Sequence, residues 1–319
     1  MSGNDMRFDD DVVIVTGAGR GLGREHALAF AHRGAAVVVN DLGTEIDGSG
    51  ESRSVAQGVV DEIKAFGGRA VADANSVTSA AGADAIVATA IAAFGRVTVL
   101  VNNAGIIDFA SLAEMTEQAW QRMIAVTLDG CFHMTRAVWP HFAAQGHGRI
   151  VNTTSNAGFA GNETLVHYGA AKLGVAGFTK ALAREVGNTG ITANAIAPMA
   201  ITRMNIDAFF GGNASQGSDW RQDIASGRVP MGPPSAVSPT VLWLAHRSTT
   251  LNGEIFSTSS GKVARVAFVV GEGYFNSSHG PEELRDHCGE IRELGSFLDP
   301  QSTADELALI PPLFRDDHS

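Results

Sequence analysis

Runs of apolar residues alternate with helical patterns along most of the chain. The apolar runs are nearly continuous, which is typical of strands buried on both faces of a parallel sheet. The predicted strands are Val12–Thr16, Ala36–Asn40, Ala70–Ala74, Val97–Asn102, Arg149–Thr154, Thr192–Ala197 and Glu254–Ser257. The predicted helices are Gly21–Arg33, Ser52–Phe66, Ala80–Phe94, Glu117–Ala144, Val166–Val186 and Ala236–His246. This order predicts an α/β fold with a doubly wound, Rossmann-type parallel sheet of about seven strands, which binds ligands at the carboxyl ends of its strands.

Three segments depart from this alternation. Gly43–Glu51 is a polar loop after the second strand, and the Gly- and Pro-containing Met204–Pro234 predicts an excursion of loop and helix. We expect one domain over residues 8–262 and a C-terminal extension over 263–319, with a helix at Pro281–Leu294. The apolar residues of the tail are expected to cover part of the same subunit, with closure of a neighbour's active site as the alternative. They are Leu307, Leu309, Ile310, Leu313 and Phe314.

Composition and charge exclude several classes of function. The 319 residues are 45% hydrophobic and 18% charged, as in an ordinary globular protein, and carry a formal net charge of −11. This acidity argues against a nucleic-acid or anionic-membrane partner, since both need basic patches. The two cysteines, Cys131 and Cys288, make no disulfide framework, and the first residues are unlike a signal peptide. We therefore expect a cytoplasmic protein that binds a small-molecule substrate and has no metal site.

The most informative motif is a glycine-rich turn between the first strand and the first helix. It reads Thr16-Gly17-Ala18-Gly19-Arg20-Gly21-Leu22-Gly23. A strand, such a turn and a helix place backbone N–H groups and a helix N-terminus against a pyrophosphate. The spacing GxxxGxG differs from the G-x-G-x-x-G dinucleotide fingerprint, so the turn alone is also compatible with an ordinary strand-to-helix connection.

A carboxylate at the end of the second strand bears on the choice of cofactor. Asp41 follows the turn by roughly 20 residues, where a carboxylate accepts hydrogen bonds from the adenosine ribose and repels a 2′-phosphate. Arg20 argues the other way, because a cation in the turn can bind that phosphate. We give Asp41 the greater weight, since its clash would occur at contact distance, and expect NAD as the cofactor.

Ser155, Tyr168 and Lys172 are the candidate catalytic residues. Tyr168 and Lys172 are four residues apart in a helical pattern and therefore share one face. An ammonium beside a phenol favours the phenolate, so we expect the pKa of Tyr168 to be lowered toward the working pH. Such a phenol is a general acid/base for the interconversion of an alcohol and a ketone. Ser155 ends the fifth predicted strand, where its hydroxyl can hold the substrate oxygen.

Taken in order, these motifs resemble the short-chain dehydrogenase/reductase family. The match covers Asp11 to Lys262 and includes Asn102-Asn103-Ala104-Gly105, whose small residues let the backbone approach a cofactor. The resemblance implies a Rossmann fold with strand order 3-2-1-4-5-6-7 and hydride transfer to or from a nicotinamide. It implies Tyr168 as the acid/base, Lys172 as the ribose-binding residue and Ser155 as the donor to the substrate oxygen. The implied cofactor contacts are Gly17, Arg20, Gly21, Leu22, Gly23, Asp41, Asn75, Ser76, Asn103, Ala104, Gly105, Tyr168, Lys172, Pro198 and Thr202.

The chain departs from the family pattern at two positions near the site. Thr127 stands where the family usually has an asparagine that anchors a water in a proton relay, which puts the relay in doubt. Met199 replaces the glycine of the family's Pro-Gly pair after the sixth strand and is expected to shape the wall of the substrate pocket.

Further segments, among them Gly19–Arg24, Val38–Gly43 and Thr135–Pro140, resemble the (3R)-hydroxyacyl-CoA dehydrogenases within the family. That resemblance implies NAD-linked oxidation of a 3-hydroxyacyl-CoA, and it leaves open whether the acyl chain is a bulky, steroid-derived one. A polyanionic CoA requires a local basic patch, for which Arg203, Arg221 and Arg228 are the candidates. Two alternatives stay open, a dehydrogenase for a free hydroxysteroid or other secondary alcohol and an NAD-binding regulatory or scaffold protein. The family resemblance also implies a homodimer or homotetramer formed through the two long helices.

Overall fold

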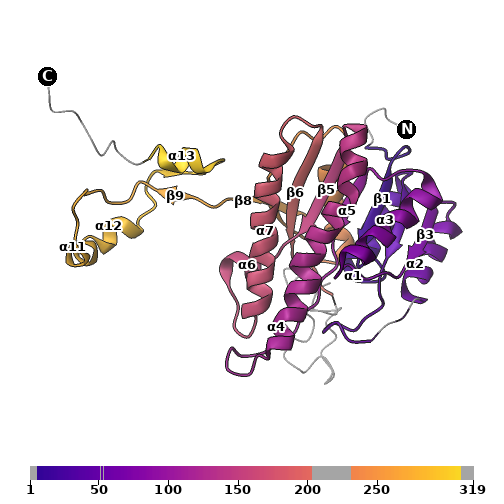
Figure 1. Ribbon diagram of the computed structural model, residues 1–319, viewed down its shortest axis with the longest axis horizontal. Helices are drawn as coiled ribbons and strands as arrows, with labels where there is room; N and C mark the ends of the chain where they lie inside the picture. Colours follow the sequence, from indigo (N-terminus) through magenta and orange to yellow (C-terminus); the bar gives the residue numbers. More distant parts are fainter. Residues whose placement is uncertain (1–5, 51, 53, 203–230, 310–319) are drawn as a thin grey trace. The chain divides into compact units, whose positions relative to one another are not determined.

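The computed structural model describes residues 6–50, 52, 54–202 and 231–309. The chain consists of two compact units, and the boundary between them lies between Arg265 and Val266. The first unit is built on an eight-stranded sheet in the order β3-β2-β1-β4-β5-β6-β7-β8, with helices packed against it (Figure 1). No helix in the described part of the chain is long and apolar enough to cross a membrane.

The strands of the sheet are short, and a helix follows most of them. The strands are β1 (Val12–Thr16), β2 (Ala36–Asn40), β3 (Arg69–Asp73), β4 (Val99–Asn102), β5 (Gly148–Thr153), β6 (Ile191–Pro198), β7 (Ile255–Ser259) and β8 (Lys262–Val266). The helices are α1 (Gly21–His32), α2 (Ser54–Ala65), α3 (Ala80–Phe94), α4 (Glu117–Ile124), α5 (Gly130–Gln145), α6 (Asn156–Ala160), α7 (Val166–Val186) and α10 (Ser238–Ala245). A short 3₁₀ turn at Pro234–Ala236 precedes α10.

The register of the parallel strands brings their carboxyl ends to one edge of the sheet. Thr16 at the end of β1 pairs with Asn40 at the end of β2, and Asn102 at the end of β4 pairs with Asn152 in β5. Every residue of these four strands is buried, because helices cover both faces of the sheet. The predicted parallel α/β fold and the predicted strand order are confirmed.

The sheet has one strand more than the sequence pattern predicts. β7 and β8 are joined by Ser260 and Gly261, both at positive φ (38° and 84°), as a two-residue hairpin turn requires. The residues of β8 are exposed or half-buried, so β8 lacks the continuous apolar run by which the other strands were predicted. It extends the sheet at the edge formed by β7.

The prediction of one continuous helix over Glu117–Ala144 is wrong in one respect, because the structure has three consecutive helical segments there. A π-helical turn at Ala125–Asp129 separates α4 from α5. A π turn adds one residue to the helix without ending it, and the apolar pattern on either side therefore reads as one long helix. Such turns are frequent at functional sites, and Thr127 is the buried residue of this one.

The second unit contains two short strands, β9 (Val270–Gly271) and β10 (Phe297–Leu298), paired antiparallel. The predicted helix Pro281–Leu294 is instead two short helices, α11 (Pro281–Asp286) and α12 (Cys288–Arg292), because His287 leaves helical geometry between them with φ −94° and ψ 11°. A last helix, α13, spans Thr303–Leu307. The tail residues Ile310, Leu313 and Phe314 and most of Met204–Pro234 lie outside the described residues.

Candidate active site

The glycine-rich turn after β1 contains glycines that no other residue can replace. Gly17 has φ 63°, and a Cβ built on it would lie 2.9 Å from the Cα of Ala104. A Cβ on Gly23 would lie 2.2 Å from the carbonyl oxygen of Gly17. The turn and the start of α1 therefore pack against each other and against the segment after β4, which is possible only without side chains.

Asn103 holds this turn in place. Its side-chain amide donates to the carbonyl oxygens of Thr16 and Gly17 at 2.9 and 3.1 Å. In return, the Thr16 hydroxyl accepts the backbone N–H groups of Asn103 and Ala104 at 3.1 and 3.0 Å. The predicted cofactor residue Asn103 thus positions the turn, while its buried neighbour Asn102 binds Asn152 Oδ1 at 2.9 Å inside the sheet.

The N-terminus of α1 is arranged to receive an anion. Arg20 occupies the N-cap position without making a side-chain cap, and the first turn carries no acidic residue. The first N–H groups of a helix have no intrahelical partner, and together with the helix dipole they favour phosphate. Among the described residues, a Cβ on Gly21 would have only Thr202 Cγ2 within 4 Å, at 3.8 Å, so that part of the structure leaves the backbone open beside the predicted contact Thr202. These features fit a dinucleotide pyrophosphate held by Gly21, Leu22 and Gly23.

Asp41 lies beside the turn and is oriented by two backbone groups. Its Oδ2 accepts the N–H of Gly19 and its Oδ1 accepts the N–H of Gly43, each at 2.7 Å. Arg20 Nη1 donates to the carbonyl oxygen of Thr44 at 3.3 Å. The carboxylate therefore stands at the end of β2 where the ribose of a dinucleotide would lie, and Arg20 is turned toward the loop that follows.

A second carboxylate, which the sequence pattern did not single out, organises the segment predicted to contact adenine. Asp73 at the end of β3 accepts hydrogen bonds from the Asn40 side chain and from both the backbone and side-chain N–H groups of Asn75, all at 2.9 Å. The Thr89 hydroxyl donates to it at 2.7 Å. The next residue, Ser76, shares a 2.9 Å hydrogen bond with Thr78. In the sequence, the position of Asp73 near the end of a predicted strand was the only signal that could have identified it as a site residue.

Ser155 and Tyr168 are brought together by close packing of α6 on α7. Ser155 is the N-cap of α6, where its hydroxyl accepts the N–H of Ala157 at 3.2 Å. A Cβ on Gly158 would lie 2.8 Å from the backbone N of Leu173, and one on Gly169 would lie 3.0 Å from the Ala157 carbonyl oxygen. These two glycines let the helices approach until the Ser155 hydroxyl, which donates to Asn156 Oδ1 at 3.3 Å, lies close enough to the Tyr168 phenol to act on its pKa.

Lys172 lies one helical turn after Tyr168 and is buried. Its Nζ donates to the carbonyl oxygen of Thr153 at 2.8 Å and lies 5.7 Å from the centre of the Tyr168 ring. The Thr154 hydroxyl donates to the Lys172 carbonyl oxygen at 2.5 Å, which ties α7 to the end of β5. Burial lowers the pKa of Lys172 to about 8.

The expectation of a lowered pKa for Tyr168 is wrong for this structure. Burial, the larger effect, raises the pKa of Tyr168, and the hydrogen bond from Ser155 acts in the opposite direction. Lys172 lies beside the ring, but its ammonium donates to the Thr153 carbonyl. Ser155 is therefore the neighbour that favours the phenolate here.

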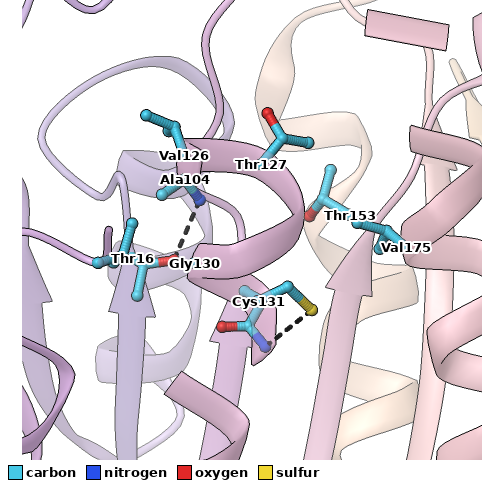
Figure 2. A pocket seen from close by; sticks show the side chains of 10 residues that line it. Thr16, Ala104, Val126, Thr127, Gly130, Cys131, Thr153 and Val175 are labelled. Carbon is cyan, nitrogen blue, oxygen red and sulfur yellow. Dashed lines mark hydrogen bonds between the residues drawn. The ribbon is translucent and has the colours of Figure 1, made fainter. Parts of the chain in front are cut away.

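A small cavity lies between β1, β4, β5 and the π turn (Figure 2). Its volume of about 10 Å³ matches one water molecule, and Thr127 and Thr153 are among the residues that line it. The Thr127 hydroxyl donates to Met123 Sδ at 3.7 Å, whereas the buried Thr153 hydroxyl has no hydrogen-bond partner among the described residues. Thr127 thus lines the same cavity as Thr153, the residue whose carbonyl oxygen accepts the Lys172 ammonium.

Pro198 is the last residue of β6, and Met199 follows it. Pro198 pairs with Thr258 of β7, and Met199 donates its backbone N–H to the Thr258 carbonyl at 2.8 Å. The Asn156 amide contacts Met199 Sδ at 3.6 Å, so Met199 lies beside the residue that follows Ser155. Gly105, after β4, faces the same region, because a Cβ on it would lie 3.4 Å from Lys172 Nζ.

The sequence profile of the short chain dehydrogenase family matches residues 11–209. The chain belongs to this family. Its members are oxidoreductases that act on CH–OH groups, and the site described above contains the serine, tyrosine and lysine by which the resemblance was first recognised. The predicted family membership is confirmed.

Curated relatives add a narrower comparison. The peroxisomal multifunctional enzyme type 2 of Mus musculus is 39% identical over 93% of this chain, which spans 38% of that enzyme. The hydroxyacyl-CoA dehydrogenase ChsB1 of Mycobacterium tuberculosis is 35% identical, with 94% of this chain and 93% of the relative covered. A solved 7α-hydroxysteroid dehydrogenase, in complex with NADH and 7-oxo glycochenodeoxycholic acid, is 29% identical with a TM-score of 0.69 and covers 82% of this chain and 97% of that one.

The multifunctional relatives are much longer than this chain, which spans about a third of the length of the first of them. Only the similarity to their matched part therefore bears on this protein.

The Asn103 contacts predict the effect of a nearly isosteric substitution. Asn103→Asp removes both donors and places carboxylate oxygens against the carbonyls of Thr16 and Gly17. We expect the free energy of unfolding to fall by about 1–3 kcal/mol, measured by urea denaturation. An unfolding midpoint equal to that of the unaltered protein would show that the amide does not hold the turn.

The pKa of Lys172 predicts a stability cost. Because that pKa falls from 10.5 to about 8 on folding, the buried charge destabilises the folded chain below pH 8, by roughly 3 kcal/mol. The cost declines as the pH rises from 8 to 10.5, since the unfolded chain then binds more protons. We expect Lys172→Met to be more stable than the unaltered protein at pH 7, and less so, or not at all, at pH 10. Urea denaturation at both pH values checks this; a difference that does not change with pH would contradict it.

Proposed function

We propose that this protein oxidises a (3R)-3-hydroxyacyl-CoA to the 3-ketoacyl-CoA with NAD. The observation that supports it most is the convergence of Ser155, Tyr168 and Lys172 at the carboxyl end of the sheet, beside an α1 N-terminus without a side-chain cap. A protein that only bound a dinucleotide as a regulator or scaffold would have no need of that arrangement. Bound NAD supplies the hydride acceptor.

In this proposal the three side chains act on the substrate hydroxyl. Tyr168, as the phenolate, accepts the hydroxyl proton while Ser155 donates a hydrogen bond to the substrate oxygen. Lys172, fixed by the Thr153 carbonyl, provides positive charge within 5.7 Å of the Tyr168 ring. The same groups return the proton when the reaction runs toward the alcohol.

The preference for NAD over NADP rests on Asp41. Two backbone N–H groups at 2.7 Å fix the direction of the Asp41 carboxylate at the end of β2. A 2′-phosphate there would meet a fixed negative charge. Arg20, the residue that argued for NADP, donates to the Thr44 carbonyl in the loop beyond.

The choice of a CoA ester rests on the relatives that are named for it. ChsB1 matches this chain nearly end to end under the name of a hydroxyacyl-CoA dehydrogenase. The basic residues proposed to meet CoA, Arg203, Arg221 and Arg228, lie outside the described residues. A free hydroxysteroid is the second candidate substrate, favoured by the likeness to the 7α-hydroxysteroid dehydrogenase structure.

We also propose a homodimer or homotetramer that uses the helices after β4 and β5. Four large apolar side chains on these helices are exposed, Trp120 of α4, Phe132 of α5, and Val166 and Leu173 of α7. Exposed apolar side chains of this size favour an interface between subunits. A cytoplasmic location stays a prediction, as several relatives carry the word peroxisomal in their names.

The test of the substrate is the formation of NADH from NAD with a (3R)-3-hydroxyacyl-CoA. We expect turnover with this isomer and none with the (3S) isomer, and a kcat/KM at least tenfold lower when NADP replaces NAD. Turnover confined to free hydroxysteroids would replace the acyl-CoA proposal with the second candidate. Equal use of NADP would refute the role given to Asp41.

The roles of Tyr168 and Ser155 predict different kinetic defects. Tyr168→Phe should lower kcat by a factor of about 10² or more, with little change in the Kd for NADH measured by fluorescence. Oxidation by the unaltered enzyme should become faster as the pH rises toward 8, because the phenolate is the base and Lys172 keeps its positive charge up to its pKa of about 8. Ser155→Ala removes the hydrogen bond that lowers the pKa of Tyr168, so its rate profile should shift to higher pH. An unshifted profile would remove Ser155 from this role.

A further inference from the structure

The polar loop after β2 closes on itself. It comprises residues 42–52, of which the structure describes 42–50 and 52; we name it the strap. Its two ends meet where the backbone N–H of Ser52 donates to the Leu42 carbonyl at 3.0 Å. A Cβ on Gly43 would lie 2.1 Å from the Ser52 carbonyl oxygen, so glycine is required for the closure. The strap is thus a compact loop with a fixed base.

The far part of the strap is bound to the segment that follows β4. The Ile46 carbonyl accepts the backbone N–H of Ile107 at 2.9 Å. Gly48, with φ 87°, packs on Ile106, whose Cγ2 would lie 3.2 Å from a Cβ at Gly48, and on the Arg122 side chain of α4. β2 and β4 flank β1 on opposite sides, so the strap crosses the carboxyl end of β1, and it runs toward α4 (Figure 1).

The glycine-rich turn also holds the first residues of the strap. Arg20, at the N-terminus of α1, donates to the Thr44 carbonyl. Asp41 binds Gly19 of the turn with one oxygen and Gly43 of the strap with the other. One carboxylate therefore joins the base of the strap to the turn that would hold the pyrophosphate.

We propose that the strap is the outer wall of the dinucleotide site and controls the rate at which the dinucleotide leaves. This inference rests on the proposed function in requiring a bound dinucleotide. The base of the strap is held by Asp41 and by the Leu42–Ser52 closure, whereas its far part is held by the Ile46–Ile107 hydrogen bond and the packing of Gly48. The base of the strap is fixed to β2 and the glycine-rich turn, and the far part rests on the segment after β4, so the far part is the end that opens.

Two glycines of the strap provide a matched pair of variants. Gly48 and Gly50 both have positive φ, 87° and 73°, so valine strains the backbone at either position. A side chain at Gly48 meets Ile106 and Arg122, but one at Gly50 meets no atom of the described residues within 4 Å. Gly48→Val therefore displaces the far part of the strap, and Gly50→Val controls for the strain alone.

The measurement is the dissociation rate of NADH, followed by stopped-flow fluorescence. We expect Gly48→Val to release NADH about five- to tenfold faster than the unaltered protein, the effect of losing one hydrogen bond and one apolar contact. Gly50→Val should release it at nearly the unaltered rate. Hydrogen exchange at the Ile107 amide gives a second readout, since NADH should slow this exchange in Gly50→Val and not in Gly48→Val.

The outcomes separate this inference from the proposed function. If NADH binds all three proteins and leaves Gly48→Val no faster than Gly50→Val, the strap does not control release and the proposed NAD chemistry is untouched. If neither NADH nor NADPH binds the unaltered protein, both proposals are overturned. Thermal unfolding of both variants checks that the fold is retained. If NADH slows the hydrogen exchange of the Ile107 amide equally in both variants, the proposed role of the strap in release is also overturned.

Discussion

The side-chain amide of Asn103 donates to the carbonyls of Thr16 and Gly17, and this contact sets the position of the glycine-rich turn against the end of β4. The short segment around it reaches the other parts of the site. Gly105 lies against Lys172 Nζ, and the Ile107 N–H binds the strap. Because these residues follow one another along the chain, a shift of this segment would disturb the glycine-rich turn, Lys172 and the strap together.

The catalytic half of the site depends on three consecutive residues at the end of β5. The Thr153 carbonyl anchors Lys172 Nζ, the Thr154 hydroxyl binds the Lys172 backbone, and the Ser155 hydroxyl contacts Tyr168. Each residue binds a different part of the first turns of α7. The end of β5 thus fixes the position of α7 along its axis and its rotation about that axis. The four-residue spacing then places Tyr168 and Lys172 on the same face of the helix.

Much of this arrangement could be predicted from the sequence, for reasons that the structure makes plain. Continuous apolar runs marked the strands because β1, β2, β4 and β5 are buried on both faces, and strand ends marked the site because parallel strands share one edge. The π turn at Thr127 could not be predicted, since one added residue leaves the apolar pattern of a helix nearly intact. β8 was missed because its residues are exposed or half-buried. The raised pKa of Tyr168 depends on burial, which residue spacing does not encode. The path of the strap depends on the Ile46–Ile107 hydrogen bond between backbone groups, which leaves no mark in the residue types.

The first turn of α1 has a wider consequence. Arg20 makes no side-chain cap, so the helix is left incomplete by its own sequence. A ligand phosphate seated there would supply what a serine or aspartate supplies in other helices. Part of the folding free energy would then come from a molecule in solution, and mass action would make the stability of the fold depend on the concentration of that molecule. The dinucleotide would in this way act as a structural part of the protein as well as a reactant.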